Sequence, residues 1–183
     1  MYSQQKDRTM KRLVISIFIF SVLALEAEQA SAQGGFGGVQ VGSEFTSNGN
    51  MLLIGGGGAW VINSNFYLGG AGYGGSNSIA TSAGELSSLG YGGLMLGYFN
   101  EVRESIRVGG DILTGSGGYS IDEIDEDFYF LEPNIKVWYS INDTMHLSAG
   151  AYYRLAYLDA NAVLNEQNLN NFGIKLSLNF GSL

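Results

Sequence analysis

The chain has no cysteine, one proline and one histidine among its 183 residues. Without cysteine it cannot form a disulfide framework, a lipoprotein anchor, a thiolate metal site or a cysteine nucleophile. A lone histidine leaves few side chains from which to build a catalytic centre. We therefore expect no catalytic residue, no cofactor and no metal site. A nucleic-acid partner is not expected either.

Long apolar runs are also scarce. The only one, Leu13 to Leu25, follows four basic residues and precedes Ala30-Ser31-Ala32. It is too short to span a bilayer, which needs about 20 residues, whereas a basic start, an apolar run and small residues are typical of a cleaved signal peptide. We predict a signal peptide at 1–32 and one domain at 33–183. Any membrane crossing by that domain must then use strands.

What the chain does have is glycine and aromatic residues, with 28 Gly, 11 Tyr and 10 Phe, which favours β structure. Residues 128–141 alternate strictly over about fourteen positions, far longer than the five or six of an ordinary strand. One parity carries Glu132, Asn134 and Lys136, and the other is apolar with tyrosines near its ends. An apolar face flanked by aromatic residues suits contact with lipid, and the polar face then lines a barrel interior.

The rest of the chain divides in the same way. Connections alternate between short turns (63–65, 100–104 and 142–143) and longer polar segments (76–87, 116–126 and 159–169), although the first outer connection, 46–50, is short. This asymmetry predicts an all-β fold, an eight-stranded antiparallel up-and-down transmembrane β-barrel with a side-chain-filled lumen. The expected strands are 35–46, 51–62, 66–75, 88–99, 105–115, 127–141, 144–158 and 170–181.

In this architecture the chain resembles the small eight-stranded bacterial outer-membrane barrels of the OmpA-transmembrane-domain and OmpX type. The last strand, with Phe172, Ile174, Leu176, Leu178 and Phe180 on one parity, is similar to the C-terminal signal of that family, although Gly181-Ser182-Leu183 follow where the family usually ends on an aromatic residue. The resemblance implies an outer-membrane location with both termini periplasmic. It also implies contact with lipopolysaccharide and insertion by the barrel-assembly machinery.

Charged residues in the middle of the expected strands predict a structural network in the lumen. A charge facing lipid near the midplane costs roughly 2–4 kcal/mol, so paired inward placement is favoured. Counting from the turns places Asp111 near Lys136, Glu132 near Arg154, and Glu44 near Lys175. The predicted network consists of Glu44, Arg107, Asp111, Glu132, Lys136, Arg154 and Lys175.

Most of the remaining acidic residues lie in the expected outer loops, five of them at 122–127. Two interpretations stay open. The loop can be a solvated, mutually repulsive tip, or its carboxylates can bind divalent cations and bridge lipopolysaccharide phosphates, although the spacing does not match an EF-hand. The loops could also contact an unknown surface ligand.

Two motifs suggest other functions. The run from Gly70 to Gly75 fits G-x-G-x-x-G, but no helical period follows, so dinucleotide binding is not expected. We expect these glycines, like Gly55 to Gly58, to accommodate bulky neighbours in the lumen. His146 and Ser148 resemble the catalytic pair of the outer-membrane lipid A deacylase barrel, and lie about 7 Å apart on one strand face. They fall at the periplasmic end, far from outer-leaflet lipid, so we do not expect catalysis.

These observations favour a non-enzymatic integral outer-membrane barrel with a structural role or a role in surface binding or adhesion through its loops. A lipid-modifying enzyme similar to lipid A deacylase is one alternative. A soluble, lipocalin-like ligand carrier is another, but it would need polar outward faces.

Overall fold

The computed structural model describes residues 32–46, 49–75, 77, 79–81, 84–121, 124–158, 162, 164 and 166–183. The predicted signal peptide, apart from Ala32, lies outside these residues and stays a prediction. In the described part of the chain the elements are β1 (Ala32–Thr46), β2 (Gly49–Ile62), β3 (Phe66–Gly75), β4 (Ile79–Thr81), β5 (Gly84–Arg103), β6 (Ile106–Ile121), β7 (Ile124–Asn142), β8 (Met145–Tyr153), β9 (Leu155–Tyr157), α2 (Glu166–Leu169) and β10 (Phe172–Gly181).

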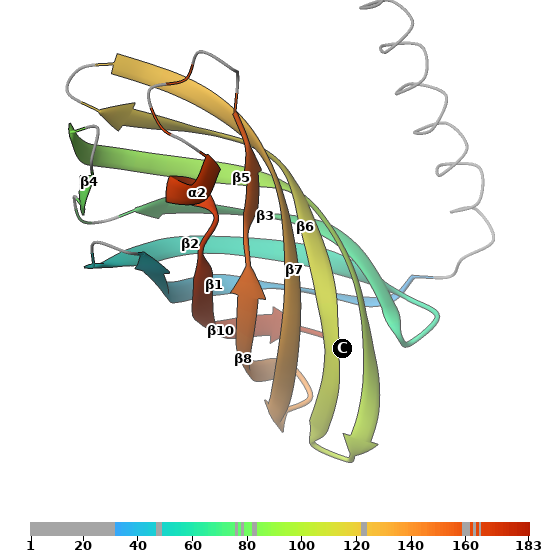
Figure 1. Cartoon of the computed structure of the whole chain (residues 1–183). Coiled ribbons are helices and arrows are strands. Elements are labelled where there is room, and N and C mark those ends of the chain that lie inside the picture. Colours follow the sequence, from blue (N-terminus) through green and yellow to red (C-terminus); the bar gives the residue numbers. More distant parts are fainter. Residues whose placement is uncertain are drawn as a thin grey trace, which may run out of the picture. The chain divides into compact units, whose positions relative to one another are not determined.

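The strands form one antiparallel sheet that closes into a barrel (Figure 1). The order of neighbours is β3-β2-β1-β10-β8-β7-β6-β5, and β5 pairs back onto β3. β9 continues β8 beyond Arg154 and pairs with β7, while β4 pairs only with the start of β5. The eight long strands of this ring, with β8 and its continuation β9 counted as one, are the eight predicted strands. No helix in the described part of the chain is long and apolar enough to cross a bilayer.

Two expected loops turn out to be mainly strand. The segment 116–126, predicted as a long connection, is a hairpin in which β6 reaches Ile121 and β7 starts at Ile124. Polar cross-strand contacts extend the pairing, because Ser120 Oγ donates to Asp125 Oδ1 (2.5 Å) and the Tyr119 hydroxyl donates to Glu126. The segment 76–87 likewise contains β4 and the start of β5. The loops were predicted from the lack of apolar alternation. Side-chain hydrogen bonds can extend strand pairing without that alternation, so the pattern did not indicate these strands.

At the opposite end of the barrel the turns are tight. The connection from β2 to β3 is the three residues 63–65, in which Asn63 and Ser64 have φ of 50° and 64°. Two successive positive φ angles are the pair that a type I′ turn needs, and asparagine tolerates them well. The amide of Asn65 donates to the Ile62 carbonyl at 3.4 Å. This short connection keeps the register of β2 and β3 continuous from Ile62 and Phe66 to Leu53 and Gly75.

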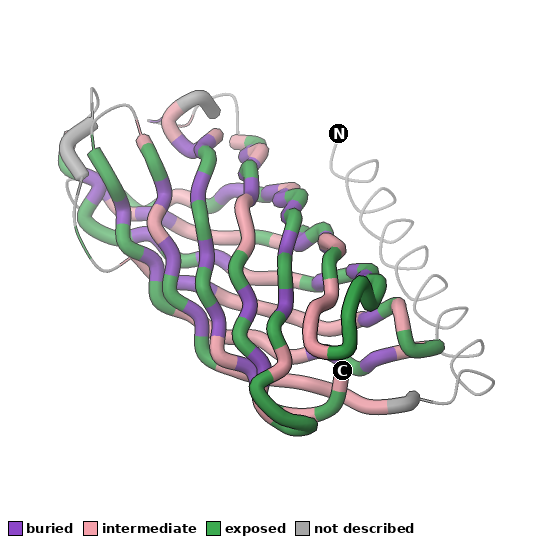
Figure 2. Tube along the Cα trace, turned by 90° about the horizontal axis from the view of Figure 1, so that it is seen from below, coloured by how far each residue is buried: buried purple, intermediate pink, exposed green. Residues whose placement is uncertain are grey.

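Buried and exposed residues alternate along the strands, as Figure 2 shows. The outward residues of β7 include Tyr129 (72% exposed), Ile135 (71%) and Tyr139 (52%). The inward residues between them, Phe130, Glu132, Asn134, Lys136 and Trp138, are all buried. The wall of the barrel is therefore apolar outside and mixed polar and aromatic inside.

Candidate functional site: the charged lumen

Three ion pairs lie inside the barrel. They join Glu44 to Arg154, Glu132 to Lys175, and Asp111 to Lys136. None of the six side chains is more than 8% exposed. With three carboxylates and three cations, the formal charges of this group cancel, as a confined low-dielectric interior requires. Along β7 and its neighbours the pairs form a loop-side layer, a middle layer and a turn-side layer.

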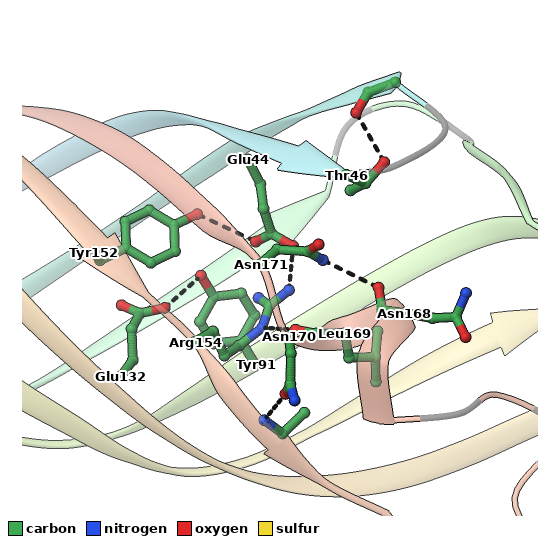
Figure 3. A network of polar contacts seen from close by, with 12 residues as sticks. Glu44, Thr46, Tyr91, Glu132, Tyr152, Arg154, Asn168, Leu169, Asn170 and Asn171 are labelled. Atoms are coloured by element: carbon green, nitrogen blue, oxygen red, sulfur yellow. Dashed lines mark hydrogen bonds and ion pairs between the residues drawn. The ribbon is translucent and has the colours of Figure 1, made fainter.

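The loop-side layer is built on Arg154, which occupies the one-residue break between β8 and β9. Its guanidinium forms the ion pair with Glu44, and its Nε donates to the Leu169 carbonyl of α2 at 3.1 Å (Figure 3). The backbone amide of Arg154 donates to the Asn171 carbonyl at 2.9 Å. Arg154 therefore fastens α2 and the following residues to the loop-side end of the barrel.

Glu44 is the common acceptor of this layer. Its carboxylate accepts from the Tyr152 hydroxyl at 3.2 Å and from Asn171 Nδ2 at 2.9 Å, in addition to Arg154. The guanidinium carbon of Arg154 lies 4.6 Å from the ring centroid of Tyr91, a cation–π contact. Every oxygen of Glu44 thus has a donor, which offsets the cost of burying its charge.

In the middle layer, Lys175 Nζ lies 2.5 Å from Glu132 Oε1. The ammonium is also enclosed by aromatic faces, 3.7 Å from the ring centroid of Tyr73 and 4.0 Å from that of Tyr152. The other oxygen of Glu132 accepts from the Tyr91 hydroxyl at 3.2 Å. Aromatic rings and a carboxylate together take the place of water around the lysine.

In the turn-side layer, Asp111 Oδ2 accepts from Lys136 Nζ at 2.5 Å and from the Tyr67 hydroxyl at 2.6 Å. Glycines make room for the large rings of the lumen. A Cβ added to Gly97 would overlap the ring of Tyr67, and one added to Gly173 would overlap the ring of Tyr152. Packed rings and paired charges therefore fill the interior.

The predicted pairing of Asp111 with Lys136 is present, but the other two partners are exchanged. Glu132 pairs with Lys175, not Arg154, and Glu44 pairs with Arg154, not Lys175. The prediction assumed that charges meet neighbours along the wall. In a barrel of eight strands long side chains meet inside the lumen, and each of these two pairs spans an intervening strand.

Arg107 belongs to a different group, at the turn end of the barrel. It lies 3.4 Å from Glu101, a half-exposed carboxylate, and its Nη1 donates to Ser140 Oγ at 3.0 Å. His146 contacts the same hydroxyl, with its Nδ1 2.9 Å from Ser140 Oγ, while its Nε2 lies 3.1 Å from the Gly181 carbonyl oxygen. Ser148 contacts Asn179 Nδ2 at 3.3 Å. Both ring nitrogens of His146 are thus engaged away from Ser148.

The sequence prediction missed the aromatic and amide members of the network. Tyr67, Tyr73, Tyr91 and Tyr152 line the lumen, and Asn171 joins Glu44 to the α2 segment. Tyr152 shares the parity of the inward Arg154, which is a signal that could have identified it. β3 has no charged residue and β5 has no buried one, so Tyr67, Tyr73 and Tyr91 had no such marker. Asn171 follows the loop that contains α2, where no alternation exists to reveal its direction.

Three glycines of the run from Gly70 to Gly75 correct a second expectation, whereas Gly75 meets it, because it faces inward and an added Cβ would lie 2.9 Å from Met51 Sδ. Gly70, Gly72 and Gly74 have the parity opposite to the buried Tyr67 and Tyr73, so they lie on the outer face and do not accommodate bulky lumen neighbours. Gly55 and Gly57 face inward, and a Cβ on Gly55 would approach the ring of Tyr73. Glycine gives no sign of which face it occupies, because it has no side chain to be buried or exposed.

Within the described residues, no group of three or more acidic or histidine side chains is arranged to hold a metal ion. Asp122, Glu123 and Asp159, three members of the predicted acidic loops, lie outside those residues. The cation-binding interpretation of the loop at 122–127 therefore stays a prediction.

No protein-family model matches the chain, and no curated protein matches it in sequence. Several solved structures are similar. Neisserial surface protein A (NspA) matches with a TM-score of 0.54 and 15% identity over 84% of this chain and 97% of that one. Ail, the attachment invasion locus protein of Yersinia pestis, matches with a TM-score of 0.49 and 13% identity over 81% and 95%. The chain has the fold of the small eight-stranded outer-membrane β-barrels, as the sequence predicted.

Proposed function

We propose that the protein is a non-enzymatic integral barrel of the bacterial outer membrane, with a structural role or a role in surface binding or adhesion through its loops. The proposal rests on the contrast between the inner and outer faces of the barrel wall. The strands that bury Glu132, Lys136 and Lys175 expose Ile135 (71%), Val137 (46%) and Leu176 (58%) on the other face. A soluble carrier in water would have the opposite preference for its outer surface.

The filled lumen limits what the barrel can do. Ion pairs and tyrosines occupy three successive layers, which supports a role as a scaffold and not as a channel for solutes. The loops would then carry the function. The outer connections and hairpin tips hold Glu85, Asp125, Glu126 and Asp127, with further acids at 122, 123, 159 and 166 and no lysine or arginine. We infer an anionic outer surface that can contact lipopolysaccharide through bound cations or an unidentified surface ligand.

The lipid-modifying alternative is weaker. A Ser–His hydrolase needs the base within reach of the nucleophile, whereas His146 contacts Ser140 and Gly181, and Ser148 contacts Asn179. The enzyme proposal would regain support if lipid A from cells overproducing the protein lost an acyl chain, and if Ser148→Ala abolished that loss.

Membrane fractionation tests the proposal. The protein should stay in the outer-membrane pellet after an alkaline carbonate wash, and an unboiled sample should migrate differently from a boiled one on a denaturing gel. Recovery in the soluble periplasmic fraction would contradict the proposal. A steady, porin-like current from the protein in planar bilayers would contradict the scaffold interpretation of the lumen.

Orientation is tested separately with epitope tags. A tag next to Gly84 or within 122–127 should be accessible on intact cells, and a tag at Asn142 should become accessible only after the outer membrane is permeabilised. The reverse pattern would invert the proposed topology, in which both termini are periplasmic. Depletion of the barrel-assembly machinery should leave the chain protease-sensitive, because insertion depends on it under this proposal.

A further inference from the structure

Asp111 on β6 and Asn134 on β7 are directly opposed in register and both point into the lumen. They are 5% and 6% exposed, respectively. Side chains opposed in this way have Cβ atoms about 4.5–5.5 Å apart. Their polar ends are therefore close enough for one small molecule to touch both.

Each of the two side chains has one oxygen without a donor among the described residues, Asp111 Oδ1 and Asn134 Oδ1. The remaining polar atoms are engaged. Asp111 Oδ2 accepts from Lys136 and Tyr67, and Asn134 Nδ2 donates to Glu132 Oε1 at 3.4 Å. A buried acceptor that lacks a donor is costly, and buried polar groups in folded proteins are nearly always hydrogen-bonded.

We propose that Asp111 and Asn134 bind one buried water molecule, which donates one hydrogen bond to each orphaned oxygen. Two neighbouring acceptors require a guest with two donors, and water is the smallest such guest. The charges argue against a cation, because the three carboxylates and three cations of the lumen already balance and a bound ion would add an uncompensated charge.

Rotation of the Asn134 amide is the competing arrangement. It would direct Nδ2 toward Asp111 but would place Oδ1 against the Glu132 carboxylate, so that two acceptors would face each other. The bridging water keeps the hydrogen bond from Asn134 to Glu132 and satisfies Asp111 as well. It also links the turn-side layer, through Asp111 and Lys136, to the middle layer at Glu132 and Lys175.

Two measurements on the wild-type protein test the site. A crystal structure at a resolution that resolves ordered water should show density bridging Asp111 Oδ1 and Asn134 Oδ1. NMR of the full barrel in lipid nanodiscs should show cross-relaxation between a long-lived water and the Asn134 side-chain amide. This result depends on the lumen alone and would stand whatever the loops bind.

Asn134→Leu removes one of the two acceptors and should abolish the long-lived water signal. Because this variant lacks the Asn134 amide, the water signal is compared between wild type and variant at the Tyr67 hydroxyl. Asn179→Leu is the matched control, because Asn179 is also an inward amide, 2% exposed, but contacts Ser148. It should leave the water signal at the Asn134 amide and at the Tyr67 hydroxyl unchanged.

Three outcomes would overturn the proposal. The first is an Asn134 amide that donates directly to Asp111 with no density between them. The second is a guest whose occupancy, and the melting temperature with it, depends on sodium, potassium or ammonium concentration. The third is a water signal that survives unchanged in Asn134→Leu.

Discussion

β7 and β3 are parts of the same barrel wall, but different features fix the register of each strand in the sheet. β7 carries large side chains on both faces, so that exposed Tyr129 and Ile135 alternate with buried Glu132 and Trp138. β3 is half glycine, with the sequence FYLGGAGYGG, and its only buried side chains are Tyr67 and Tyr73. Sliding β7 by one residue would move Glu132 and Lys136 from the lumen to the outer face, whereas most of β3 could slide with little change.

The two tyrosines compensate for the weak pattern of β3. Tyr67 fits beside Gly97 of β5 and donates to Asp111 of β6 at 2.6 Å, and Tyr73 donates to Gln40 of β1 at 2.5 Å. Both contacts reach strands that are not neighbours of β3 in the sheet. Many side chains along β7 therefore fix its register, whereas two side chains fix the register of β3. This difference predicts which substitutions each strand will tolerate.

The largest effect is expected from reversing a charge on the inner face of β7. Glu132→Lys would place a third cation beside Lys175 and Lys136 in the lumen. Removal of one partner from a buried pair typically costs about 3–5 kcal/mol, and reversal should cost more, so we expect little folded barrel by the unboiled gel shift. Glu132→Gln, which keeps the shape, should lose less stability to urea. Equal resistance of wild type and both variants would mean that the inward parity of β7 is wrong.

A smaller effect is expected where β5 receives the ring of β3. Gly97→Ala would push a methyl group into the Tyr67 ring, and overpacking of this kind costs roughly 1–3 kcal/mol. The matched control is Gly74→Ala on the outer face of β3, where an added Cβ meets nothing within 4 Å. That substitution should be neutral or stabilising by about 0.4–1 kcal/mol. Urea midpoints in detergent compare the two, and a loss at Gly74 equal to that at Gly97 would refute the role given to Tyr67.

The contrast between these strands also explains what could be read from the sequence. The number and order of the strands and the parity of β7 were predictable. In a strand with alternating polar and apolar residues, each side chain indicates whether it lies on the inner or the outer face of the sheet. The outward position of Gly70, Gly72 and Gly74 was not predictable, since glycine reveals neither face. The long hairpin of β6 and β7 was missed because Ser120 and Asp125 stabilise it by hydrogen bonds and not by apolar alternation.

For the lumen, the sequence predicted which charges point inward better than it predicted their partners. Arg154 and Lys175 have flexible side chains several atoms long, so small differences in direction decide which carboxylate each one reaches. Arg154 is directed to Glu44 by its further bond to the Leu169 carbonyl, a contact that depends on the fold of a loop. Neither the exchange of partners nor the role of Asn171 could follow from spacing along the strands.

The smallest effect tests a single hydroxyl. Tyr67→Phe keeps the ring beside Gly97 but removes the donor to Asp111 Oδ2, an oxygen that Lys136 still contacts at 2.5 Å. We expect a loss of about 1.5 kcal/mol, the lower end for a hydrogen bond to a charged group, because the lysine remains. Tyr129→Phe on the outer face of β7 is the control and should change the urea midpoint much less, since Tyr129 is 72% exposed and no lumen group depends on it. If the two variants lost the same stability, the hydroxyl of Tyr67 would contribute nothing particular to holding β3, and ring packing alone would have to fix its register.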